Sequence, residues 1–224
     1  MQTGSCELDK CFLCHHCLPE WKSLISLHKT TFVFKKGQKI FKEGDPVEGM
    51  FFVNEGTVKV TMKWEDQKDL LLRFATSGDV LGHRGLGGIP AYPITATALE
   101  ETKVCFINNQ FLETTLTTNT RFTYQLMQLY ASELQKAEQR MRDLAHREVK
   151  GRIALALLEI DNLFGKTEGQ FTTVPLTRQD IAAYAGTTYE TVFKFFNELT
   201  HRNILSTAGK NLKINDRKAL ESFI

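Results

Sequence analysis

Short apolar or alternating runs, separated by glycines, make up most of the first half of the chain. They are rich in β-branched and aromatic residues, and the glycines lie where tight turns need an unhindered backbone. The runs are residues 32–34, 40–41, 50–53, 57–60, 70–72 and 104–106. This pattern predicts short strands in an antiparallel barrel or roll.

A long helix is predicted after these strands. Residues 119–146 contain neither glycine nor proline, and apolar residues recur there at spacings of three and four. A period of about 3.5 residues keeps one seam facing a partner helix. The seam consists of Met127, Tyr130, Leu134, Ala137, Met141 and Leu144.

A second apolar stripe on the same helix contains Phe122, Leu126 and Leu129. Two apolar faces favour one side on the roll and the other on a second copy of the chain, which predicts a homodimer. The alternative is that both stripes belong to the core of a single chain, because a seam of this length is modest evidence.

A helix is predicted over residues 152–164, followed by a polar loop at residues 165–170. After this loop, two further short helices joined by a glycine are predicted. Thr177 with Asp180 three residues on indicates a helix start, and Gly186 indicates its end. Thr187 with Glu190 forms a second capping-box pattern, so the next helix is expected to begin at once. Together these signals predict a helix-turn-helix.

The second of these helices has one apolar face, formed by Val192, Phe195, Phe196 and Leu199. If that face is buried, the opposite face presents polar residues near the N-terminus of the helix to the edges of DNA bases. These residues are Thr188, Tyr189, Glu190 and Lys194. A hairpin of residues 204–207 and 212–214 follows, and Lys210 at its basic tip suits a wing on phosphate.

Basic and acidic residues nearly cancel over the whole chain. There are 28 Lys and Arg against 26 Asp and Glu, so any nucleic-acid binding must come from a local basic face. The chain lacks a run of eighteen apolar residues, and its N-terminus is polar and acidic rather than basic and then apolar. We therefore expect a cytoplasmic protein without a membrane partner.

The sequence argues against an enzyme. A cupin-like metal enzyme needs several histidines and a carboxylate inside its barrel, whereas residues 31–106 contain only His83. The sequence offers no Ser/His/Asp, P-loop or paired-acid pattern elsewhere. A module that binds only proteins through the helix seam would leave the capping signals and the basic wing unexplained.

Several motifs resemble the CRP/FNR transcription regulators. Residues 176–182, Gly186 and residues 190–192 resemble the helix-turn-helix of that family. Residues 36–45 and 50–60 resemble its cyclic-nucleotide-binding-type β-roll. The similarity extends from about residue 31 to residue 214, with every element in the order of the family.

The resemblance implies an α+β fold in four parts. They are a cysteine-rich segment (1–30), a jelly-roll-like β-roll sensor domain (31–118), a dimerisation helix (119–146) and a winged helix-turn-helix domain (147–224). It also implies a homodimer on a palindromic operator in double-stranded DNA, with RNA polymerase as a further partner. Thr177, Arg178 and Gln179 look like the family's phosphate contacts. Tyr189 stands where many members have a guanine-reading arginine, so the usual half-site does not carry over.

The resemblance also places a ligand pocket, altered here, at Gly82, His83, Arg84 and Thr95. His83 replaces the glutamate that holds the ribose in members that bind cyclic nucleotides, and Ile94 lies where the phosphate-binding arginine would be. A buried phosphate would then lack its partner unless Arg84 substitutes for that arginine. We expect that the chain does not bind a cyclic nucleotide.

Four of the five cysteines, Cys6, Cys11, Cys14 and Cys17, fall within twelve residues. In a reducing compartment such clustering indicates metal binding or redox chemistry. The C-x2-C-x2-C spacing predicts three thiolates on one tight loop, suited to an iron–sulfur cluster that takes a fourth ligand from elsewhere. Cys105 is that candidate, since residues 98–105 resemble the FNR branch where the fourth cluster cysteine stands.

Other uses of these cysteines stay open besides a 4Fe–4S cluster. The second gap in the cysteine motif is shorter than is usual in the family, and His15 and His16 stand beside the motif. The same residues could therefore hold zinc. Unliganded thiols or a thiol redox switch are the remaining uses, and Cys6 is a spare or replacement ligand. The alternative for the sensor is that the same regulator fold responds to a small ligand, a cyclic nucleotide or another, without a cluster.

Overall fold

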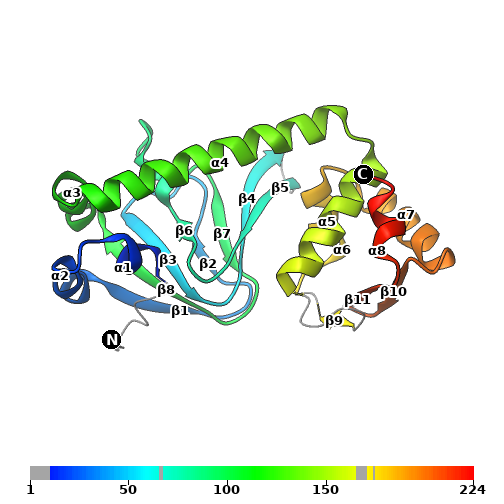
Figure 1. The fold of residues 1–224 in the computed structure, drawn as a ribbon, viewed down its shortest axis with the longest axis horizontal. Helices are drawn as coiled ribbons and strands as arrows, with labels where there is room; N and C mark the ends of the chain where they lie inside the picture. Colours follow the sequence, from blue (N-terminus) through cyan, green and yellow to red (C-terminus); the bar gives the residue numbers. More distant parts are fainter. Residues whose placement is uncertain (1–10, 66–67, 165–170, 174) are drawn as a thin grey trace. The chain divides into compact units, whose positions relative to one another are not determined.

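The computed structural model describes residues 11–65, 68–164, 171–173 and 175–224. The chain divides into two compact units, one of Met1–Gln67 with Leu72–Leu134 and one of Lys68–Leu71 with Gln135–Ile224. The boundary near residue 134 falls inside the long helix α4 (Thr120–His146). That helix has the extent predicted from the sequence (Figure 1).

Two four-stranded sheets form the roll in the described part of the chain, in the orders β1-β8-β3-β6 and β2-β7-β4-β5. Neighbouring strands are antiparallel in β1–β8, β3–β8, β3–β6, β2–β7 and β4–β7, as a roll requires. The strands are β1 (Thr30–Phe34), β2 (Lys39–Phe41), β3 (Gly49–Glu55), β4 (Val58–Glu65), β5 (Lys68–Ala75), β6 (Val80–Leu81), β7 (Thr95–Ala98) and β8 (Thr102–Asn108).

The apolar runs of the sequence coincide with strands β1 to β5 and β8, whereas the sequence patterns did not indicate β6 and β7. Strand β7 consists of Thr and Ala alone and so lacks the large apolar residues that indicate a strand. It is nevertheless buried, because it lies between β2 and β4. At the start of β3, a Cβ on Gly49 would lie 2.0 Å from the Ile107 carbonyl oxygen, so only glycine allows this approach to β8.

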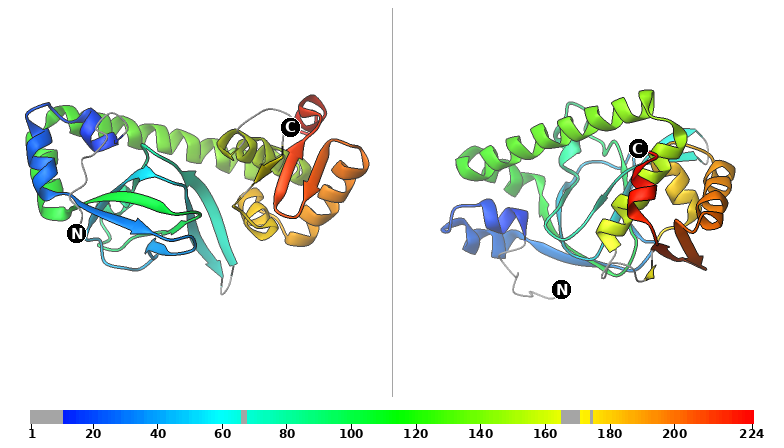
Figure 2. Two further views of the ribbon diagram at one scale, coloured as in Figure 1. Left: turned by 90° about the horizontal axis from the view of Figure 1, so that it is seen from below. Right: turned by 45° about the vertical axis from the view of Figure 1, so that its right-hand side comes forward.

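Helices cover one side of the roll. Helices α1 (Phe12–His16), α2 (Trp21–His28) and α3 (Asn109–Thr118) and the start of α4 share one hydrophobic cluster with strands β3 and β8. Figures 1 and 2 show α1 and α2 beside α3 and the first turns of α4. The prediction of a tight cysteine loop is wrong, because Cys14 lies inside α1 and the amide of Cys17 donates to the Leu13 carbonyl (3.0 Å).

The second unit combines helices with a small sheet. Its helices are α5 (Val149–Phe164), α6 (Arg178–Ala185), α7 (Tyr189–His201) and α8 (Arg217–Glu221), and its sheet has the order β10-β11-β9. The strands are β9 (Thr172–Thr173), β10 (Leu205–Ala208) and β11 (Asn211–Ile214). The loop predicted at residues 165–170 lies outside the described residues.

Helix α5 starts at Val149, before the predicted position. Gly151 is therefore inside the helix, where a Cβ would lie 2.6 Å from the Phe223 carbonyl oxygen. Close packing against the C-terminal segment explains this glycine, which stands just before the predicted helix of residues 152–164. Among the described residues, the helices are too short or too polar to span a membrane.

Candidate nucleic-acid interface

The first helix of the predicted helix-turn-helix is closed at both ends by local hydrogen bonds. The amide of Asp180 donates to Thr177 Oγ1 (3.1 Å), and the amide of Thr177 donates back to Asp180 Oδ2 (2.9 Å). Gly186 ends α6 in the left-handed region (φ 61°, ψ 49°), and its amide donates to the Ala182 carbonyl. Both sequence signals are confirmed.

The predicted cap of the second helix is wrong by one residue. Thr188 has extended backbone angles, and its Oγ1 accepts from the amide of Thr191 (3.3 Å), so Thr188 rather than Thr187 caps α7. The amide of Thr187 instead donates to the Ala182 carbonyl (3.0 Å) in the turn after α6. Thr187 therefore belongs to the turn that closes α6, and α7 begins one residue later than predicted.

The two faces of α7 are as predicted. Val192, Phe195, Phe196 and Leu199 are buried, whereas Tyr189, Glu190 and Lys194 are exposed, together with Thr188 at the cap. The pKa of the Glu190 carboxyl is lowered, first by its own backbone amide and then by the Thr188 hydroxyl. The carboxylate is therefore ionised at neutral pH and can accept hydrogen bonds.

The structure adds an aromatic side chain that the sequence analysis missed. Phe193 is 42% exposed, and its ring stacks on Tyr189 with the centroids 6.2 Å apart. The guanidinium carbon of Arg178 lies 6.0 Å from the Phe193 centroid and 5.2 Å from that of Phe196. The sequence already contained a signal for Phe193, because this residue lies outside the apolar stripe of α7 and four residues after Tyr189.

The wing and the start of α6 offer further exposed donors. Strands β10 and β11 pair so that Ala208 faces Asn211, which leaves Gly209 and Lys210 as the turn. Gly209 has a φ of 62°, as such two-residue hairpin turns require. Lys210, Thr177 and Gln179 are exposed, and Arg178 is partly buried.

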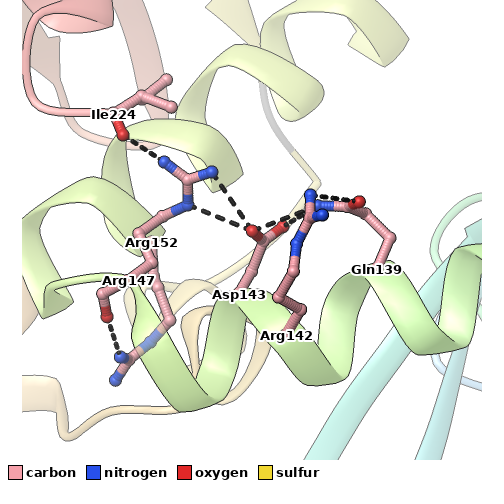
Figure 3. Close-up of polar contacts among 6 residues, drawn as sticks. All are labelled: Gln139, Arg142, Asp143, Arg147, Arg152 and Ile224. Atoms are coloured by element: carbon pink, nitrogen blue, oxygen red, sulfur yellow. Dashed lines mark hydrogen bonds and ion pairs between the residues drawn. The ribbon is translucent and has the colours of Figure 1, made fainter.

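An arginine on α5 holds the turn of the helix-turn-helix. Arg152 Nε donates to the Ala185 carbonyl (2.9 Å), and Nη2 donates to that of Gly186 (3.2 Å). Its Nη1 donates to the Arg147 carbonyl (2.7 Å), just after α4 ends (Figure 3). One guanidinium thus fixes the C-terminus of α6 to the segment that joins α4 and α5.

The same segment is held by a second arginine. Arg147 Nη2 lies 3.1 Å from Asp143 Oδ1 on the last turns of α4, and Nη1 donates to the Ile224 carbonyl. Asp143 Oδ1 also accepts from Gln139 Nε2 (3.2 Å). Figure 3 shows these side chains converging on Asp143. The end of α4 is thereby joined to the C-terminal residue of the chain by charge-assisted hydrogen bonds.

The seam residues of α4 are mostly exposed, with exposed fractions of 63% for Met127, 60% for Leu134, 64% for Met141 and 36% for Leu144. Ala137 is exposed as well. Tyr130 differs: its hydroxyl donates to the His83 carbonyl, so it packs on the roll of its own chain. Phe122 and Leu126 of the second stripe are buried there as predicted.

The cysteines are gathered in one core cluster. Cys11, Cys14, Cys17 and Cys105 are all buried in the cluster beneath α1 to α4, and Cys6 lies outside the described residues. Burial, and next the neighbouring Cys11, raises the pKa of the Cys17 thiol to about 12. Among the described residues, no three His, Cys, Asp or Glu side chains are grouped closely enough to hold a metal ion.

The residues of the predicted ligand pocket make contacts within the roll and with α4. Ile94 and His83 are buried, and the Thr95 hydroxyl accepts from the Glu43 amide (3.0 Å). Gly82 has a φ of 81°, which permits the turn into the 3-10 helix η1 (His83–Leu86). Arg84 is already paired, because its Nη2 lies 3.0 Å from Glu133 Oε2 of α4.

Comparison with known sequences and structures identifies both parts of the chain. Residues 31–119 match the cyclic nucleotide-binding domain, and residues 151–223 match the Crp-like helix-turn-helix domain. FixK2 from Bradyrhizobium japonicum has a solved structure that is similar with a TM-score of 0.75. It is 28% identical, and the match covers 87% of this chain and 96% of that one.

Curated relatives include regulators of two kinds. FnrA, a transcriptional activator of Stutzerimonas stutzeri, is 28% identical over 92% of this chain and 87% of its own. A CRP-like cAMP-activated global transcriptional regulator of Mycobacterium tuberculosis H37Rv is 27% identical over 84% of each chain. Because the two kinds of regulator are almost equally similar to this chain, the signal that it senses has to be inferred from its own residues. The architecture is common to both kinds, and the chain belongs to the CRP/FNR family of DNA-binding transcription regulators.

Proposed function

We propose that the chain acts as a homodimer that places the N-terminal end of α7 in the major groove of each half of a palindromic operator. The exposed polar face of α7, opposite its four buried apolar residues, is the observation that carries this proposal. Glu190 would accept from a cytosine amino group, and Lys194 would reach guanine or phosphate. Thr188 would meet the base edges as well, and Tyr189 would contact the sugar–phosphate edge.

Contacts to phosphate would position these side chains. Thr177, Arg178 and Gln179 lie at the start of α6, where the helix N-terminus favours an anion. Lys210 at the wing tip would contact phosphate farther along the duplex. Arg152 would act indirectly, because it holds the turn between α6 and α7.

Duplexes selected from a random pool by the full-length protein provide the test. We expect the double variant E190A/K194A to lose discrimination of about 1–3 kcal/mol at one or two base pairs. Lys210→Ala should weaken binding to all duplexes alike and reduce the salt slope by about one. Lys63→Ala, which removes an exposed charge from β4, is the matched control and should bind as wild type.

The signal is assigned to the cysteine cluster as part of the same proposal. Cys11, Cys14, Cys17 and Cys105 would hold a 4Fe–4S cluster, which supplies oxygen-labile redox chemistry. Four buried thiols in one core support this assignment in donor type and burial. Because Cys14 lies inside α1, bringing the thiols together would require α1 to rearrange, next to Phe122 and Leu126 of α4.

Purification without oxygen tests the assignment by composition. We expect about four irons with acid-labile sulfide per chain, bleaching in air, and loss of iron in Cys14→Ser and Cys105→Ser. Zinc without iron would instead favour the zinc alternative. A metal-free protein whose dimerisation and DNA binding are the same with and without air would overturn the assignment. That result would not contradict the proposal for DNA binding.

RNA polymerase is proposed as the partner that reads the bound dimer, and the cytoplasm as the compartment where this happens. Family membership supports both. Transcription reconstituted with purified polymerase on a selected operator should change when the regulator is added. The direction of that change distinguishes an activator from a repressor.

A further inference from the structure

One carboxylate of α4 faces three basic side chains of the roll. Glu133 Oε2 lies 3.0 Å from Arg84 Nη2, 3.5 Å from Arg73 Nε and 4.0 Å from His83 Nε2. Arg73 is on β5, and the other two side chains are on η1. Helix α4 thus places an anion at the point where the end of β5 and η1 bring their positive groups together.

His83 lies at the buried end of the cluster, and the side chains of Arg73, Arg84 and Glu133 are partly exposed (18%, 29% and 13%). His83 is 1% exposed; the Val80 backbone acts on its imidazole, but neither ring nitrogen meets the geometry of a hydrogen bond with the described residues. Arg73 Nη2 donates to the Val80 carbonyl (2.7 Å), but its buried Nε has no hydrogen-bond partner among those residues. Buried polar groups of this kind are costly to leave without acceptors.

The charges of the cluster are set by its members. Burial opposes ionisation of Glu133, but Arg73 and Arg84 outweigh it and hold the pKa of that carboxyl below its usual range. Burial, followed by Arg73, lowers the pKa of His83 to about 4, so the imidazole is neutral. Asp79 also acts on Arg73, although its carboxylate accepts from the Thr76 amide (2.7 Å).

We infer that Arg73, His83 and Arg84 form an oxyanion-binding site whose resident anion is Glu133 of the chain itself. The carboxylate fills the site, so the roll is closed on α4 without an external phosphate or carboxylate, and such an ion is excluded. Tyr130, one turn earlier on α4, ties the same helix to η1 through the His83 carbonyl. This inference does not depend on what the cysteines bind.

Removing the resident carboxylate should open the site to an outside anion. In Glu133→Gln the two guanidiniums lose their counter-charge, and we expect a lower melting temperature in chloride that recovers in inorganic phosphate at equal ionic strength. Wild type and Glu138→Gln, which changes an exposed glutamate on the same helix, should show only the small general effect of phosphate. Titration calorimetry should detect phosphate binding to Glu133→Gln alone.

Two results would overturn the inference. One is a folded Glu133→Gln protein whose melting responds to phosphate no more than that of Glu138→Gln. The other is saturable phosphate binding of equal affinity to wild type, since Glu133 should block it. If Glu133→Gln does not fold, Glu133→Asp retracts the carboxylate by one methylene and should show a partial recovery in phosphate; its absence also rejects the site.

Discussion

Two buried titratable groups of the first unit, His83 and Cys17, have pKa values far from those of exposed side chains. Both shifts have burial as their largest cause, and a neighbour adds to each: Arg73 for His83 and Cys11 for Cys17. Neither shift could be read from the sequence, since the neighbours are distant along the chain or depend on how α1 packs. For these two residues, burial has a larger effect than residue type on the pKa of the side chain.

Acid should destabilise the protein through His83. The folded pKa of about 4 lies below the unfolded value of 6.5, so between these limits the unfolded chain binds more protons. Stability should therefore fall as the pH drops from 6.5 toward 4, by at most about 3 kcal/mol from this group. Denaturation of wild type and His83→Gln across that range should show a shallower decline in the variant; parallel declines would contradict the burial of a neutral imidazole.

Two glycines have nearly the same φ, so alanine substitutions at them distinguish the cost of backbone strain from the cost of steric crowding. Gly186 and Gly209 have φ near 61°, but a Cβ on Gly186 would lie 2.6 Å from Leu144 Cδ2, whereas a Cβ on Gly209 would have nothing within 4 Å. We expect Gly209→Ala to cost about 1 kcal/mol of unfolding free energy and Gly186→Ala about 2 kcal/mol. Urea titrations that give equal costs would show that Leu144 moves aside freely.

At the scale of elements, the position where a helix ends depends on which backbone amides and carbonyls already form hydrogen bonds in neighbouring turns. Helix α6 is capped by Thr177 and by Gly186 as the sequence predicts, because both signals act locally. The start of α7 moves to Thr188 because the Thr187 amide serves the preceding turn. Strand β7 shows the same dependence on neighbours, since only pairing with β2 and β4 makes its Thr and Ala residues a strand.

The position of the α7 cap can be checked with adjacent threonines. Thr188→Ala should lower the unfolding free energy by about 1 kcal/mol, because the Thr191 amide loses its acceptor. Thr187→Ala should change it by less than about 0.5 kcal/mol, since alanine retains the backbone amide. If the larger loss occurs at Thr187, the cap lies where the sequence pattern put it.

At the scale of the whole molecule, the exposed seam of α4 bears on assembly. Met127, Leu134 and Met141 are exposed apolar side chains on one helix at heptad spacing, and soluble helices seldom leave such a stripe uncovered. We predict that a second copy covers it. Tyr130 is excluded from this seam by its hydrogen bond to the roll.

A charge in the seam should separate the protomers. Leu134→Glu buries a carboxylate from each chain in the predicted interface, and we expect the dimer dissociation constant to rise at least about tenfold. Gln135→Glu adds the same charge at an exposed position outside the seam and should leave the dimer intact. Sedimentation equilibrium measures both; an unchanged constant for Leu134→Glu would place the interface elsewhere.

The sequence by itself determined the features that depend on neighbours along the chain. Apolar or alternating runs specified β1 to β5 and β8, an uninterrupted 3.5-residue period specified α4, and the Thr177, Asp180 and Gly186 signals specified α6. The exposed and buried faces of α7 followed in the same way, since they depend only on helical geometry.

Only the tertiary structure decided which distant groups meet. Glu133 faces Arg73 and Arg84 because α4 packs on the roll, and Cys105 joins the N-terminal cysteines because α1 covers the β3–β8 pair. Burial and pairing between elements set the charge of His83 and the partners of each thiol. These contacts join residues far apart in the chain, so local periodicity carries no record of them.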